Sequence, residues 1–167
     1  MAYLRLTMDP LPAGSRFATL ARLLPPSQWD AIRRSAYRRA GYRCEVCGSQ
    51  ARLHCHEVWQ CSPETGYQWL RGFQALCPLC HDTKHAVFAR DPPRRAEVLQ
   101  HFARVNGTTL LEAEEHLRQA IRRQRELDQR QWTISYGDHN FAMPALRDLE
   151  QRRQYARALR PRSAFVP

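Results

Sequence analysis

The chain has 167 residues, of which 43% are hydrophobic and 25% charged, a balance that indicates a folded globular protein and excludes a disordered one. Its 26 lysines and arginines exceed its 16 aspartates and glutamates by ten, which favours a polyanionic partner, although solubility or contact with acidic lipid headgroups are alternatives. No apolar run approaches the roughly 20 residues of a membrane span, and residues 1–12 lack a secretory signal, so we expect a cytoplasmic protein with reduced cysteines.

The first half of the chain predicts a leader, a helix and a β-hairpin. Residues 1–26 form a proline-punctuated leader with one short helix, in which we find no chemistry. A helix over 27–40 is expected to begin at Ser27 as its N-cap. Strands are expected at 52–59 and 67–70, joined by a turn at 63–66. The fold class is therefore α+β, with a small metal-binding domain over 27–91.

The second half is predicted to be helical. Helices are expected at residues 81–90, 92–105, 111–131 and 144–159, with a short extended segment at 132–136. Thr109 is a possible N-cap of the longest helix, which carries an apolar stripe on one face and arginines on the other. Residues 92–160 thus form a basic helical extension, followed by a mobile tail at 161–167.

Two cysteine pairs form the strongest metal-binding pattern. They are Cys44 with Cys47 and Cys77 with Cys80, a C-x2-C-x29-C-x2-C arrangement. This spacing is typical of a closed four-cysteine zinc site, in which thiolates fill every coordination position and the ion stabilises the fold. A site built from Cys77, Cys80 and His85 would need another cysteine near position 90, which is Arg90. Cys55 and Cys61 are expected to be core residues or spare thiols.

Histidines beside the second cysteine pair indicate another metal site. His81 and His85 are four residues apart, so on a helix they lie on the same face and could bind a single ion. His56, on a predicted strand, is the candidate third ligand. Imidazole suits Zn²⁺ and Ni²⁺, and accepts Mg²⁺ or Mn²⁺ when water and phosphate oxygens complete the shell. Such a site would keep open positions for catalysis; taken alone, the pair could also be surface histidines.

The order of these motifs resembles the HNH endonucleases that have a zinc-binding ββα-metal fold. The resemblance covers about residues 29–90 and is most specific from Leu76 to His85, which reads Leu-Cys-x-x-Cys-His-x-x-Lys-His. It implies a small ββα-metal core with a structural Zn²⁺, flanked by an N-terminal helix and a C-terminal helical extension. It also implies hydrolysis of nucleic-acid phosphodiesters, most readily DNA, with one catalytic divalent ion: Mg²⁺, Mn²⁺, Ni²⁺ or Zn²⁺.

The catalytic dyad of that family falls on His56 and Glu57. Aligning the apolar neighbours Leu53 and Val58 makes His56 a metal ligand and puts Glu57 where the family has its base histidine. Glu57 could then act as the general base, since a carboxylate near a cation can accept a proton from water. In the alternative register His56 is the base and His54 orients it.

The asparagine of the family pattern falls on Gly72. Gln74 or Gln68 could replace it. Arginines are expected to hold the phosphate backbone without reading sequence, with a solvated face as the alternative. These arginines are Arg33, Arg34, Arg38, Arg118, Arg122 and Arg125.

The sequence thus predicts a metal-dependent endonuclease. The alternative is a noncatalytic zinc-ribbon module that binds nucleic acid, which the missing dyad histidine and asparagine favour. A third hypothesis is an interaction protein of a phage or mobile-element assembly. We expect no membrane partner, whereas a protein partner is left open.

Overall fold

The computed structural model describes residues 4–15 and 18–136. These residues form a mixed α+β fold, as expected, with five α-helices and a three-stranded sheet. In chain order the elements are η1 (Ala13–Ser15), α1 (Leu20–Leu23), α2 (Pro26–Arg39), β1 (His54–Ser62), β2 (Tyr67–Leu76), α3 (Pro78–Lys84), η2 (Ala86–Phe88), α4 (Pro92–Asn106), α5 (Leu110–Asp128) and β3 (Thr133–Ser135). The helix and tail predicted beyond residue 140 lie outside the described residues.

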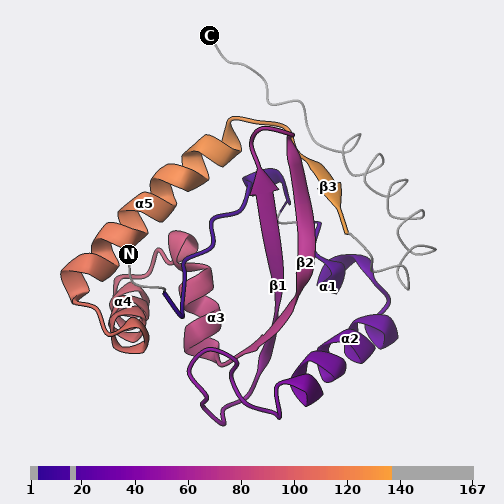
Figure 1. The fold of residues 1–167 in the computed structure, drawn as a ribbon, viewed down its shortest axis with the longest axis horizontal. Helices are drawn as coiled ribbons and strands as arrows, with labels where there is room; N and C mark the ends of the chain where they lie inside the picture. The colour runs from indigo at the N-terminus through magenta and orange to yellow at the C-terminus, as the bar shows by residue number, and fades with distance from the viewer. Residues whose placement is uncertain (1–3, 16–17, 137–167) are drawn as a thin grey trace.

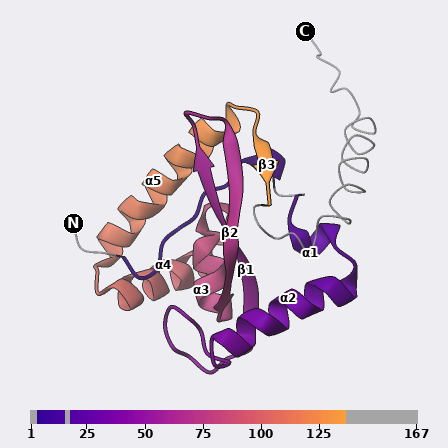
Figure 2. The same cartoon turned by 45° about the vertical axis from the view of Figure 1, so that its right-hand side comes forward.

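A β-hairpin separates two groups of helices. Figures 1 and 2 show β1 and β2 at the centre, with α3, α4 and α5 on one side and α1 and α2 on the other. The two strands pair antiparallel, and β3 adds to β2 in parallel. Each face of the hairpin is thereby covered by its own set of helices.

Both strands of the hairpin are longer than predicted. β2 continues to Leu76, so it ends directly before Cys77, and His56 lies opposite Gln74 in the register. A bulge interrupts the pairing between Val58 and Trp59, opposite Gly72. Gly72 has a φ of +151°, a backbone conformation that residues with a Cβ rarely adopt. The bulge therefore requires glycine where the family pattern has asparagine.

Local sequence signals set most helix ends. Thr109 and Glu112 form the reciprocal hydrogen bonds of a capping box at the start of α5, and Gly107 ends α4 in the left-handed conformation. The prediction for Ser27 was wrong. Helix α2 starts at Pro26 with Pro25 as its N-cap, two residues before the predicted cap, because proline fits the first helical position without losing a hydrogen bond. No helix in the described ranges is both long and apolar enough to cross a membrane.

The N-terminal segment is part of the core. We call residues 4–12 the strap; in both views it runs between α5 and the hairpin (Figures 1 and 2). Leu6 is fully buried in a cluster that includes Phe102 of α4 and Leu117 of α5. The Asn106 side chain donates to the Leu6 carbonyl and accepts from its amide, at 2.9 and 3.0 Å. The sequence boundaries at residues 26 and 91 therefore do not separate independent cores.

A second core lies on the opposite face of the hairpin. It contains Leu20 of α1, Ile32 of α2, Leu70 of β2 and Tyr136, with Trp59 packed against it. The Tyr136 hydroxyl donates to the Ala18 carbonyl at 2.8 Å. The segment after α5 thus returns to the N-terminal part of the chain and closes this core.

Replacing Asn106 with alanine tests how firmly the strap is attached. The change removes both hydrogen bonds to Leu6 and leaves a backbone amide and carbonyl without these partners, so we expect a loss of about 1–3 kcal/mol in unfolding free energy. Urea denaturation measures this loss. The control is Gln119→Ala, because that side chain contacts only Glu115 on the exposed face of α5. Equal stability of the two variants would contradict the idea that Asn106 holds the strap in place.

Candidate metal centres

The four paired cysteines come together at one end of the hairpin. Their sulfur atoms all lie within 4.8 Å of one another, close enough to hold a metal ion such as zinc. The hairpin explains how pairs 29 residues apart meet, since β2 returns the chain to the start of β1. The Glu45 amide also donates to the Ala75 carbonyl at 2.9 Å, which ties the first pair to the residues just before the second.

The second cysteine pair also forms the start of α3. Cys77 is the N-cap, and its sulfur accepts a hydrogen bond from the Cys80 amide at 3.4 Å. Pro78 follows at the first helical position. Helix α3 therefore begins three residues earlier than predicted, because the thiol replaces the usual oxygen cap. Its first turn is held by the cysteine cluster.

His101 of α4 supports this cluster and was missed in the sequence. Its Nε2 lies 3.0 Å from the Cys80 sulfur, while its Nδ1 lies 3.1 Å from a guanidinium nitrogen of Arg104. Guanidinium groups only donate, so Nδ1 accepts and the proton of the neutral ring is on Nε2. Cys80 then accepts this hydrogen bond, as a metal-bound thiolate does. No spacing rule links positions 80 and 101, so only packing reveals the contact.

The protonation of the thiols favours a bound cation. The hydrogen bond with Cys80 lowers the pKa of Cys44 to about 4, whereas the same bond, with burial, raises the pKa of Cys80 above its usual value. One negative charge thus opposes ionisation of the neighbouring sulfur. A central cation removes this conflict because it attracts all four thiolates.

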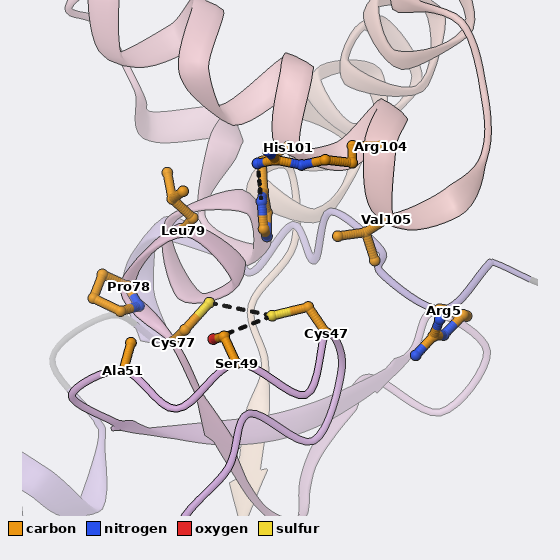
Figure 3. A pocket seen from close by; sticks show the side chains of 10 residues that line it. All are labelled: Arg5, Cys47, Ser49, Ala51, Cys77, Pro78, Leu79, His101, Arg104 and Val105. Carbon is orange, nitrogen blue, oxygen red and sulfur yellow. Dashed lines mark hydrogen bonds between the residues drawn. The ribbon is translucent and has the colours of Figure 1, made fainter.

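A cavity of about 640 Å³ adjoins the cysteine cluster. Figure 3 shows Cys47, Cys77 and His101 around it, with Arg104 beside His101. The complete lining is Arg5, Cys47, Ser49, Ala51, Cys77, Pro78, Leu79, His101, Arg104 and Val105. Its walls contain none of the histidines predicted to bind a second ion, so this cavity is separate from the histidine site.

The three predicted histidine ligands converge on the α3 side of the hairpin. His56 comes from β1, His81 from α3 and His85 from the residue that caps α3. One ring nitrogen of each lies within 4.8 Å of the others. Ring centres are 5.6 Å apart for His56 and His81, 5.0 Å for His56 and His85, and 4.7 Å for His81 and His85. We call these three residues the histidine triad.

Two members of the histidine triad, His81 and His85, have lowered pKa values. Burial and the proximity of His56 lower the pKa of both His81 and His85 to about 4. His56 itself is only 3% exposed. A neutral imidazole has a nitrogen lone pair that can bind a metal, so a set of three imidazoles fits a divalent cation.

The structure does not bring Glu57 to the histidine triad. Adjacent strand residues point to opposite faces of a sheet, so Glu57 faces the second core while His56 faces α3. The carboxylate accepts hydrogen bonds from the Trp59 indole at 3.1 Å and the Ala21 amide at 3.3 Å. Glu57 is thus wrongly placed for the general base predicted from the dyad. Its partners and burial indicate a structural role.

The same alternation along the strands decides which of the other candidate residues lie on the face of the histidine triad. His54 lies on the triad side, with its ring centre 4.9 Å from that of His81. Gln74 pairs directly with His56 across the hairpin. Gln68 is buried and pairs with Cys61, which is five positions along β1 from His56 and therefore on the opposite face of the hairpin. Of the two residues considered in place of the family asparagine, only Gln74 is therefore near the triad.

Most of the predicted phosphate-binding arginines already have acidic neighbours. Arg33 and Arg34 lie 2.6 and 3.7 Å from Asp30 on α2. Arg118 and Arg122 lie 2.9 and 3.0 Å from Glu115 on α5. Arg38 and Arg125 are exposed on the same two helices. The basic surface is therefore partly neutralised within the protein, and α5 is a mixed-charge helix more than a basic one.

Replacing Cys77 with serine tests the cysteine cluster. Serine removes one sulfur ligand and weakens the cap of α3, so we expect loss of bound zinc together with loss of helical structure. Elemental analysis and far-ultraviolet circular dichroism measure the two effects. Cys61→Ser is the matched control because Cys61 lies outside the cluster. A wild-type protein that folds fully without metal would refute the assignment.

Replacing Glu57 with glutamine tests its structural role through pH. Burial raises the pKa of Glu57 from 4.5 to about 7, so the folded protein holds this proton more tightly than the unfolded chain. The contribution of this tighter proton binding to the free energy of unfolding is fully present below pH 4.5 and is lost as pH rises through 7. Glu57→Gln should remove this decline and gain up to about 3 kcal/mol at pH 8 relative to wild type. Parallel denaturation curves at pH 5 and pH 8 give the difference, and an unchanged difference would contradict the prediction.

Comparisons with family models, with curated proteins and with solved structures give no match for this chain. Any functional assignment therefore rests on the arrangement of the side chains in the two candidate metal sites. Its two main features are the cluster of four thiols and the histidine triad, which are linked by α3.

Proposed function

We propose that this protein is a metal-dependent nuclease that hydrolyses phosphodiester bonds in DNA. In this proposal a zinc ion at the four cysteines stabilises the fold, and a divalent ion at the histidine triad serves catalysis. The observation that carries the proposal is the convergence of three imidazoles, from β1, α3 and the residue that caps α3, with one ring nitrogen of each within 4.8 Å of the others. A hairpin followed by a helix that together supply these ligands is also what the resemblance to HNH endonucleases predicts.

The triad suits a catalytic ion better than a structural one. Three nitrogen ligands leave coordination positions open for substrate and water, whereas the four cysteines leave none. A divalent ion bound there supplies Lewis-acid chemistry: it lowers the pKa of water and offsets negative charge on the phosphate. The side chains of His81 and His85 keep partial exposure, so a phosphate group can approach them from solvent.

His54 is the residue we assign as general base in place of Glu57. It lies on the triad side of β1, two residues from His56, and its ring is next to that of His81. His54 is outside the set of three ligands, so it can accept the proton of the attacking water while the others hold the ion. Gln74, opposite His56, could orient either the phosphate or the water.

The basic composition favours a nucleic-acid substrate. The formal net charge of +10 attracts a polyanion, and the phosphodiester is the bond that this donor set and charge would act on. Because several arginines on α2 and α5 are paired with acids, we expect modest affinity with little sequence preference. A noncatalytic zinc module that binds nucleic acid remains the second candidate, supported by the displaced Glu57.

Replacing His85 with alanine decides between these two functions. The change removes one triad ligand but leaves the cysteine cluster and the surface arginines in place, so we expect cleavage to stop while DNA binding persists. Plasmid cleavage with Mg²⁺, Mn²⁺, Ni²⁺ and Zn²⁺, and a gel shift at several salt concentrations, measure the two activities. His54→Gln should lower the cleavage rate by about 10²- to 10⁴-fold with metal affinity nearly unchanged.

Glu57→Gln is the control for these variants, and we expect it to keep its cleavage activity. If wild-type protein binds DNA but cleaves neither DNA nor RNA with any of the four ions, the binding module is the correct function. If Glu57→Gln loses activity while His54→Gln keeps it, the assignment of the base is wrong.

A further inference from the structure

The strap places a carboxylate at the edge of the histidine triad. Asp9 Oδ2 lies 3.7 Å from Nε2 of the buried His56, although the two residues are 47 positions apart. The sequence offered no reason to connect the leader with the metal site. The contact arises because the strap crosses the hairpin on the side where α3 lies, as Figures 1 and 2 show.

Asp9 is held in this position by several contacts with the strap and α3. Its backbone amide donates to the Lys84 carbonyl at 2.9 Å. Its carboxylate receives the Lys84 ammonium at 3.0 Å and the Thr7 hydroxyl at 2.6 Å. The strap is anchored on both sides of Asp9, by Asn106 at Leu6 and by Gln124 at Leu11. Asp9 is therefore a fixed part of the site.

The distance between Asp9 and His56 is slightly longer than that between two ligands of one ion, and Asp9 lies just outside the group of three histidines whose ligand atoms are all within 4.8 Å of one another. At 3.7 Å the oxygen and nitrogen are too far apart for a good hydrogen bond. Two donors that each bind a cation at about 2.1 Å in tetrahedral or octahedral geometry lie about 3.0–3.4 Å apart, so a small closure around an ion brings the pair into range. A carboxylate also supplies a negative charge, which imidazole ligands cannot supply.

We infer that Asp9 is a fourth ligand of the cation at the histidine triad, making a three-histidine, one-carboxylate site that in an octahedral shell still leaves two positions open for water and phosphate. This inference rests on the proposed binding of a cation by the triad. It assigns the N-terminal strap a direct part in metal binding. An oxygen ligand favours harder ions such as Mn²⁺ and Zn²⁺ over Cu⁺. The buried Lys84 ammonium lies 3.0 Å from the carboxylate and also donates to the Thr7 hydroxyl at 2.8 Å, so it offsets the charge of Asp9.

The first test measures metal affinity without any reaction. Full-length protein with zinc at the four cysteines is titrated with Co²⁺ and with Mn²⁺ by calorimetry. Asp9→Asn keeps the shape but removes the charge, and we expect it to weaken second-site binding by about 10- to 100-fold. Asp30→Asn is the matched control, since Asp30 is an aspartate on α2 that pairs only with arginines. Equal affinities of the two variants would overturn the inference.

The second test distinguishes direct ligation from an indirect effect on the strap. In Asp9→Cys the new sulfur can bind Co²⁺ itself, which gives a sulfur-to-cobalt absorption band in the near ultraviolet; zinc at the cysteine cluster is colourless. We expect this band, together with partial recovery of Co²⁺ affinity over Asp9→Asn. Absence of the band in a variant that still binds Co²⁺ would show that Asp9 is not a ligand.

These tests separate the inference from the proposed function. If wild-type protein binds a second cation and cleaves DNA while Asp9→Asn has unchanged affinity, only the role of Asp9 is refuted. If wild-type protein binds no cation beyond the first zinc, both the role of Asp9 and the catalytic proposal are refuted.

Discussion

The clustering of four sulfur atoms is the constraint on which both candidate metal sites depend. Four sulfur atoms at this separation could hold a metal ion, and such a cation would offset the repulsion between their thiolates. Cys77 and Cys80 belong to the first turn of α3, which means that whatever holds the cysteines also fixes the direction of the helix. His81 and His85 follow within the next turn. The structural site therefore orients two of the three histidines of the second site.

The two faces of the hairpin have different environments: one faces α3 and the histidine triad, and the other faces the second core. Because side chains alternate along a strand, His56 and Glu57 are neighbours in sequence but lie in different environments. His56 meets α3 and the other histidines, whereas Glu57 meets Trp59 and α1 in a largely apolar core. A carboxylate in such a core costs stability when it ionises, which suggests that its hydrogen bonds to the indole and to Ala21 are what retain it.

Helices α4 and α5 and the strap pack directly against the two candidate metal sites. Phe102 of α4 and Leu117 of α5 share one core with the cysteine cluster, and His101 contacts the Cys80 sulfur. The strap passes through the same core and ends up beside His56. A minimal fragment of residues 27–91 would lack these contacts, so we regard the helical extension as necessary for a stable metal site.

The sequence by itself determined the features that depend on local spacing. The paired cysteines, the i to i+4 histidines, the capping box at Thr109 and the stop at Gly107 all follow from residues within a few positions of one another, and all are present in the fold. Only the tertiary structure decided the features that depend on long-range packing. The alternation of β1 turned Glu57 away from the histidines, the bulge fixed glycine at position 72, and the strap placed Asp9 beside His56 across 47 residues. Helical and strand periods fix which residues share a face, but which segment covers that face is set by how the whole core packs.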